Sequence, residues 1–136
     1  MSRALVFGNG RFLVTLDQHG FVRDMHYPYV GLENHVSGNK HRIGVMVGED
    51  YSWVDDGSWQ INLGYKPETM VGYLVCKNDS LQVSLVMEDI VYNESEVFLR
   101  QVDIYNHSDQ DKPIKIFFHQ VFHISENKKR NTAFYD

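Results

Sequence analysis

Short apolar segments separated by turn residues run along the whole chain and predict a protein built from β-strands. In segments such as 59–63 and 81–88, large apolar and polar side chains alternate, which is the period of a half-buried strand. No apolar stripe with a 3.6-residue period and capping residues continues for three turns, so we expect little or no helix. Roughly ten strands are predicted, at residues 4–7, 12–16, 21–26, 42–47, 51–54, 59–63, 70–76, 81–92, 97–105 and 114–124.

The turn residues between these segments indicate the fold class. Asn9-Gly10 between two apolar runs is a strong hairpin signal, and a second turn ends at Gly20, so residues 1–26 are predicted to form a three-stranded meander. Segments 70–76 and 81–92 are expected to pair across a polar turn. Many short strands with regular turns are typical of sandwiches. We therefore expect an all-β, antiparallel β-sandwich in a single domain spanning residues 1–136.

Composition argues against nucleic-acid and membrane partners and favours a reducing compartment. A hydrophobic fraction of 43% is that of a globular protein, and 13 basic against 18 acidic residues give a net charge of −5, which argues against a nucleic-acid partner. No apolar stretch is long enough to span a bilayer, and no signal-peptide core is present, so we expect no membrane contact. Cys76 is the only cysteine, which fits a reducing, cytoplasmic location.

The stretch 27–35, Tyr-Pro-Tyr-Val-Gly-Leu-Glu-Asn-His, is the candidate contact loop. Pro28 lacks an amide donor, so a paired strand is expected to end just before it, and Gly31 allows backbone angles closed to other residues. Arg42 is a candidate anchor, because its guanidinium could hold Glu33 or backbone carbonyls. The alternative is that the loop merely closes one end of the sandwich. The candidate contact residues are Tyr27, Tyr29, Glu33, Asn34, His35 and Arg42.

The familiar catalytic and metal-binding patterns are not credible in this sequence. The two adjacent acidic pairs, at 55–56 and 88–89, do not provide carboxyls that face each other across a cleft, because strand neighbours point apart and a turn pair is expected to be solvated. His119 and His123 would lie on one strand face about 13 Å apart, too far for one metal ion. Cys76 has no nearby base, and no glycine-rich phosphate loop is followed by a helix. We expect no catalytic residue, no metal and no cofactor.

Aromatic residues at 51–65 allow two readings. Trp53 and Trp59, with neighbouring tyrosines, could form a platform that stacks on sugar rings. Aromatic side chains are also the normal core of a sandwich. Both readings stay open at this point.

Four stretches together resemble the start of bacterial and archaeal glucoamylase-like enzymes of glycoside hydrolase family 15: 8–14, 27–35, 42–45 and 131–136. In that family an N-terminal β supersandwich precedes an (α/α)6 barrel that carries the catalytic glutamates. The resemblance implies that 27–35 lies at the interface between sandwich and barrel, near the mouth of the active site. The barrel has no counterpart in this sequence, so no catalytic residue carries over.

The resemblance implies a non-catalytic accessory domain of an α-glucan hydrolase, with the barrel as its partner and α-glucan as a possible ligand. The alternative is a stand-alone carbohydrate-binding or protein-interaction module. The last residues resume a strand-like pattern and then stop, which predicts a chain cut within a larger β structure. Strands 97–105 and 114–124 are apolar on both faces, so we expect a homo-oligomer, unless longer loops fold back over the open face.

Overall fold

The computed structural model describes residues 2–124, and all regular elements in this part of the chain are β-strands. The predicted all-β class with ten strands is confirmed. Residues 2–124 contain no helix that could cross a membrane. The motif at 131–136 lies outside the described residues. The strands are β1 (Leu5–Gly8), β2 (Leu13–Leu16), β3 (Val22–His26), β4 (Arg42–Val47), β5 (Asp50–Trp53), β6 (Gln60–Tyr65), β7 (Gly72–Asn78), β8 (Val83–Val91), β9 (Phe98–Asn106) and β10 (Ile114–His119).

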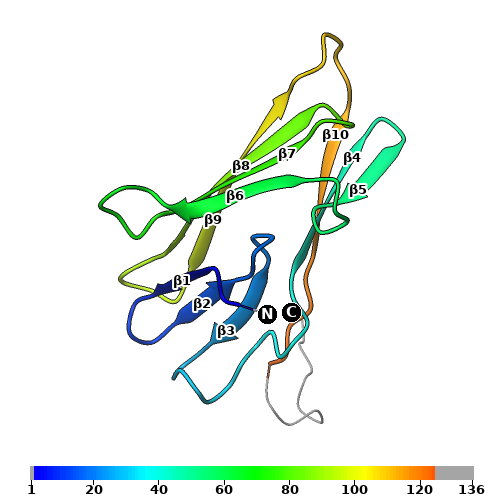
Figure 1. Cartoon of the computed structure of the whole chain (residues 1–136). Helices are drawn as coiled ribbons and strands as arrows, with labels where there is room; N and C mark the ends of the chain where they lie inside the picture. The colour runs from blue at the N-terminus through cyan, green and yellow to red at the C-terminus, as the bar shows by residue number, and fades with distance from the viewer. Residues whose placement is uncertain (1, 125–136) are drawn as a thin grey trace, which may run out of the picture.

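The strands form three antiparallel sheets (Figure 1). Sheet A is the predicted meander β1-β2-β3, sheet B has the order β10-β4-β5, and sheet C has the order β6-β7-β8-β9. The expected pairing of 70–76 with 81–92 is present as β7 with β8. Sheets A and B are joined by a bridge between Val22 and His41. Together they pack against sheet C.

The core lies between sheet C and the other two sheets. Side chains from all three sheets contribute to one buried apolar cluster, including Phe7 of β1, Val45 of β4 and Leu85 of β8. Close contact between the layers depends on Gly72, whose missing side chain leaves room for the Phe7 ring. The alternating burial of β7 and β8 follows the period of two that the sequence shows.

The turn between β2 and β3 is set by one carboxylate and one glycine. The buried Asp17 accepts hydrogen bonds from the backbone amides of His19 (2.8 Å) and Phe21 (3.1 Å). Gly20 has a φ of 75°, a conformation that glycine adopts at little cost. The predicted turn at 17–20 is therefore confirmed, and the Oδ1 atom of its carboxylate is bonded by backbone amides rather than by solvent.

Strand β10 is shorter than predicted, because it ends at His119 and not at residue 124. Its last residue pairs with Arg42, the first residue of β4. The residue before Arg42 is His41, which donates its backbone amide to the Val22 carbonyl of β3 at 2.9 Å, so the chain just before β4 is paired with sheet A. Residues 120–124 are held by other contacts, such as that of the His41 ring with the Val121 carbonyl at 3.2 Å.

The core is incomplete on the side where β9 and β10 lie. Ile104 of β9 is 44% exposed, whereas its pairing partner Leu85 in β8 is fully buried at 0%. Phe118 of β10 is 49% exposed, whereas its partner Ile43 in β4 is 1% exposed. Within the described part of the chain, each of these two strands pairs on one side only. One side of the sandwich is therefore open.

Candidate functional site

The base of the loop 27–35 is fixed by the side chain of Asn34. Its Oδ1 accepts hydrogen bonds from the backbone amides of Met25 (3.1 Å), Val36 (3.1 Å) and Ser37 (3.3 Å). Its Nδ2 donates to the Asp24 carboxylate at 2.9 Å. Asn34, predicted as a contact residue, thus ties the loop to β3.

The carboxylate of Asp24 is part of the same network. It also accepts hydrogen bonds from Thr15 and Arg3, both at 2.7 Å. Burial alone would raise the pKa of Asp24, but the hydrogen bonds from Thr15, Arg3 and Asn34 and the charge of Arg3 outweigh it and lower the pKa. The anchor of the loop is therefore a charged group with fixed donors.

His35 connects the loop to the segment that follows β10. Its Nδ1 lies 2.8 Å from the His123 carbonyl oxygen, and its Nε2 lies 3.0 Å from the Tyr27 carbonyl oxygen. A carbonyl only accepts, so the neutral ring donates to one of them at a time and the protonated ring donates to both. Two backbone hydrogen bonds complete the link: the His35 amide donates to the Met25 carbonyl, and the His123 amide donates to the His35 carbonyl, each at 2.7 Å.

The tip of the loop presents side chains to solvent. Tyr27, Tyr29, Val30 and Leu32 are all exposed. The side chain of Glu33 makes no hydrogen bond or ion pair with any described residue. A rigid base with an exposed apolar tip is an arrangement suited to contact with another surface.

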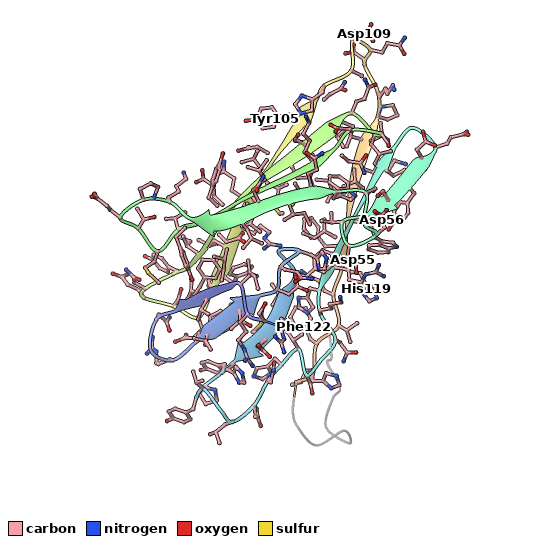
Figure 2. All side chains as sticks on the ribbon, in the orientation of Figure 1. Asp55, Asp56, Tyr105, Asp109, His119 and Phe122 are labelled. Carbon is pink, nitrogen blue, oxygen red and sulfur yellow. The ribbon has the colours of Figure 1, made fainter. Side chains whose placement is uncertain are left out.

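Arg42 does not hold Glu33, which corrects the expectation from the sequence. Its Nη2 donates to the Asp55 carboxylate at 2.8 Å, and its guanidinium lies over the Trp53 ring, 4.2 Å from the centroid. Because Asp55 lies in the turn after β5, this pair ties β4 to that turn and leaves the loop 27–35 untouched. His119 pairs with Arg42 at the start of β4, and so lies at the same end of sheet B as Asp55; both side chains are labelled in Figure 2.

The two tryptophans predicted as stacking residues have different surroundings. Trp59 is only 8% exposed, and its indole N–H donates to Ser52 Oγ at 2.8 Å. It belongs to the core cluster and offers no open ring face. Trp53 lies on the outer face of sheet B, half-buried between Arg42 and the ring of Tyr51.

The adjacent carboxylates have structural partners. The expectation that Asp55 and Asp56 are merely solvated is wrong, because Asp55 pairs with Arg42 and Asp56 accepts hydrogen bonds from Ser52 and Ser58. These contacts, together with the charge of Lys40 on Asp55, lower the pKa of both carboxyls against the opposing effect of burial.

Glu88 and Asp89 point to opposite faces of β8, as expected. The fully buried Asp89 receives two hydrogen bonds from Arg100, at 2.8 and 2.7 Å, and Arg100 also donates to the Gly20 carbonyl at 2.8 Å. Glu88 pairs with Lys66 on the outer face. A bidentate buried pair of this kind fixes the packing of sheet C against the β2–β3 turn.

His119 and His123 do not share a strand. His123 lies beyond the end of β10, where its Nε2 is 2.9 Å from the Asn39 side-chain amide. Among residues 2–124, no three His, Cys, Asp or Glu side chains come together as a group that could hold a metal ion. Cys76 is buried, and burial raises the pKa of its thiol to about 12.

An apolar groove of about 550 Å³ lies on the open side of the sandwich. Its walls come from sheet A, from the start of β9, and from β10 with the residues after it; Figure 2 places Phe122 there. Burial lowers the pKa of His41 at the groove, although the hydrogen bond to the Val121 carbonyl opposes this. Apolar lining residues include Phe12, Val22, Met25, Phe98, Phe118 and Phe122.

Comparison with known proteins relates the chain to a glycosyl hydrolase. It is 28% identical over 128 residues to a protein of Methanocaldococcus jannaschii that is named an uncharacterized glycosyl hydrolase. The match covers 94% of this chain and 20% of that protein, so the chain spans about a fifth of the length of the curated relative it matches. No family model matches the chain, and no solved structure matches it at a significant level.

Sequence reasoning missed two features of this surface. The groove depends on which sheets lie side by side, and no local pattern reports that. The positions of Phe117 beside Tyr51 and of His119 beside Trp53 follow from the pairing of β10 with β4, two strands far apart in the sequence. The alternation of 114–119 places Phe117 and His119 on one face, but the sequence does not reveal which strand pairs with them.

Proposed function

We propose that this chain is a non-catalytic β-sandwich domain of a larger glycoside hydrolase. The observation that carries the proposal is the match of 94% of the chain to one fifth of a protein named a glycosyl hydrolase. Such coverage is what a domain within a longer polypeptide produces. The resemblance to glucoamylase-like enzymes suggests that the partner is a catalytic (α/α)6 barrel acting on α-glucan, in a cytoplasmic enzyme.

Two surfaces support a role in packing against another part of an enzyme. In the groove beside β9 and β10, apolar side chains such as Phe118 and Phe122 are about half exposed to solvent. The tip of the loop 27–35 exposes Tyr29, Val30 and Leu32 on a base held by Asn34. Apolar surfaces of this kind favour burial against a partner. We assign the loop 27–35 to the contact with the catalytic barrel, near the mouth of its active site. We propose that the groove is covered by a further part of the same β-sandwich.

The chemical role that follows is support rather than catalysis. Glycoside hydrolysis needs two carboxyls facing each other across the substrate, roughly 5–9.5 Å apart with room for a sugar between them. Asp55, Asp56 and Asp89 are each committed to partners within this chain. We therefore assign no catalytic acid or base to the domain.

The proposal can be tested in the Methanocaldococcus protein by removing or exchanging the segment that matches this chain. The Methanocaldococcus protein is prepared whole, without its matching fifth, and with this chain in place of that fifth. Glucose release from a panel of α- and β-linked oligosaccharides is measured together with the melting temperature of each protein. We expect the deletion to lose both activity and stability and the chimera to recover a large part of both. A deletion as active and as stable as the whole protein would contradict the proposal.

The chain alone supplies the second arm of that test. We expect no glucose release from maltose or starch above a buffer blank. Hydrolysis that is removed by substitutions within this chain, such as Glu33→Gln, would show that the domain carries its own catalytic group.

A further inference from the structure

The outer face of sheet B carries aromatic rings where an outward face normally carries polar side chains. In an antiparallel sheet with one buried face, alternate residues are expected to be polar and solvated. Here the pairing of β10, β4 and β5 brings Phe117, Gly44 and Trp53 into one row across the sheet. Sheet B thus carries aromatic rings on its outer face in addition to the apolar side chains of its core face.

Gly44 lies at the centre of this face. A Cβ at Gly44 would clash with the Tyr51 hydroxyl and would lie 2.9 Å from Tyr51 Cζ and 3.1 Å from Trp53 Cε3. The missing side chain therefore lets two rings lean over the backbone of β4. Tyr51 contacts Trp53 and Phe117 edge-on, with centroids 5.3 and 5.7 Å apart.

Part of this ring cluster stays open to solvent. Tyr51 is 45% exposed and Phe117 is 41% exposed, whereas Trp53 is covered on one side by Arg42. Tyr51 and Trp53 lie over Gly44 and shield its backbone from solvent, which accounts for their positions. It does not account for the exposed Phe117 ring beside them.

Fixed polar groups border the rings. Arg42 is held by Asp55 at 2.8 Å, and Lys40 lies 3.7 Å from the same carboxylate. His119 lies beside Trp53, with ring centroids 6.4 Å apart, and pairs with Arg42 across β10 and β4. Donors and acceptors that are already oriented cost little entropy when they bind a ligand.

We propose that this face binds a neutral oligosaccharide, with a pyranose ring on Tyr51 and Phe117 and its hydroxyls toward Arg42, Asp55 and His119. A pyranose presents C–H bonds on one face, which suit the negative face of an aromatic ring, and hydroxyls around its edge, which suit a border of fixed donors and acceptors. The rings and the charged border lie next to each other on one surface, and this juxtaposition favours a sugar over a purely apolar partner.

This inference goes beyond the proposed function and does not depend on it. A supporting domain requires no sugar site. The rings of the sheet B face, Tyr51, Trp53 and Phe117, line neither the groove nor the loop 27–35, whereas Arg42 of the polar border also lines the groove. Failure of sugar binding would leave the assignment as a hydrolase domain intact. Failure of the chimera test would equally leave the sugar site standing.

Titration of the ¹⁵N-labelled chain with maltoheptaose and with cellohexaose tests the proposal. We expect the amide signals of Gly44 and Phe117 and the indole signal of Trp53 to shift at millimolar sugar. Phe117→Ala and Tyr51→Leu should weaken binding by about fivefold to tenfold or more, since each removes one stacking ring. Tyr105→Ala is the matched control, because this tyrosine is 51% exposed on the outer face of β9, away from sheet B (Figure 2). It should leave the affinity unchanged.

Three results would overturn the proposal. The first is that neither sugar shifts any of these signals at millimolar concentration while circular dichroism shows a folded chain. The second is that shifts occur but persist in both ring variants. The third is that Phe117→Ala abolishes self-association in sedimentation while sugar signals are absent, which would make the face an interface between copies of the chain.

Discussion

At the scale of single residues, Asn34 and Glu33 show how neighbours in one loop take opposite roles. The Asn34 side chain makes hydrogen bonds with three backbone amides and with Asp24, whereas Glu33 has no such partner among the described residues. Both are polar residues in a polar loop, so the sequence makes them look equivalent. The difference arises from the turn geometry that places the Asn34 amide between the two ends of the loop.

We predict that Asn34→Ala destabilises the protein. The change removes an acceptor from three backbone amides and a donor from Asp24, and unsatisfied groups of this kind cost about 1–3 kcal/mol each when they are shielded from water. Since the site is only partly buried, we expect a total loss of about 2–3 kcal/mol in the free energy of unfolding. Urea denaturation followed by circular dichroism measures it.

Glu33→Ala is the control for this prediction. A surface substitution without partners should change the free energy of unfolding by no more than about 0.5 kcal/mol. Equal effects of the two substitutions would show that the Asn34 network does not hold the loop.

At the scale of elements, the turns are where local sequence and tertiary packing meet. Gly10 and Gly20 both have positive φ, at 94° and 75°, and each lies in a turn whose backbone amides donate to a polar side chain, Asn9 in the first turn and Asp17 in the second. A Cβ at Gly10 would meet nothing within 4 Å, whereas one at Gly20 would clash with Leu74 Cδ2 in the core. The two glycines therefore differ in what lies beside them, open space at Gly10 and the core at Gly20.

We predict that Gly20→Ala is more damaging than Gly10→Ala. The left-handed conformation costs a side chain about 1–2 kcal/mol at either position. Overpacking against Leu74 adds about 1–3 kcal/mol at Gly20 alone. Paired thermal or urea unfolding of the two variants measures this difference directly. A Gly10 variant as unstable as the Gly20 variant would mean that strain in the turn, rather than contact with sheet C, sets the cost.

The strands themselves were predictable because their signals are local. Alternation and turn residues lie within a few positions of each other, so all ten strands were predicted near their observed places. The end of β10 was not, since it depends on the pairing of His119 with Arg42 at the start of β4, a strand far away in the sequence. The same limit applies to the candidate site. Trp53 and Trp59 look alike in sequence, and only the packing of the sheets places Trp59 in the core against Ser52 and Trp53 on the outer face under Arg42.

At the scale of the whole molecule, the open side of the sandwich is the dominant feature. Core-facing positions are fully buried in the middle of the layers and become exposed toward β9 and β10, where each strand pairs on one side only within residues 2–124. Unpaired strand edges beside apolar side chains are templates for further pairing. A partner that covered this side would pair with the free edges of β9 and β10 and would bury the apolar side chains beside them.

We predict that the isolated chain self-associates through this open side. In the absence of another partner, a second copy related by a two-fold axis would bury the same apolar patch twice. Sedimentation equilibrium across a concentration series should therefore show an average mass that rises above the 15.9 kDa of the monomer.

Two neighbouring residues on β9 provide the decisive comparison. Ile104 faces the open core and Tyr105 faces outward, and both are exposed. Ile104→Glu places a charge inside the surface to be buried, where an unpaired carboxylate is costly, so it should return the chain to the monomer. Tyr105→Glu adds the same charge one residue away on the other face and should leave the association unchanged. A wild-type chain that stays at the monomer mass at every concentration would show that the open side tolerates water, and loss of association in Tyr105→Glu alone would move the interface to the outer face of sheet C.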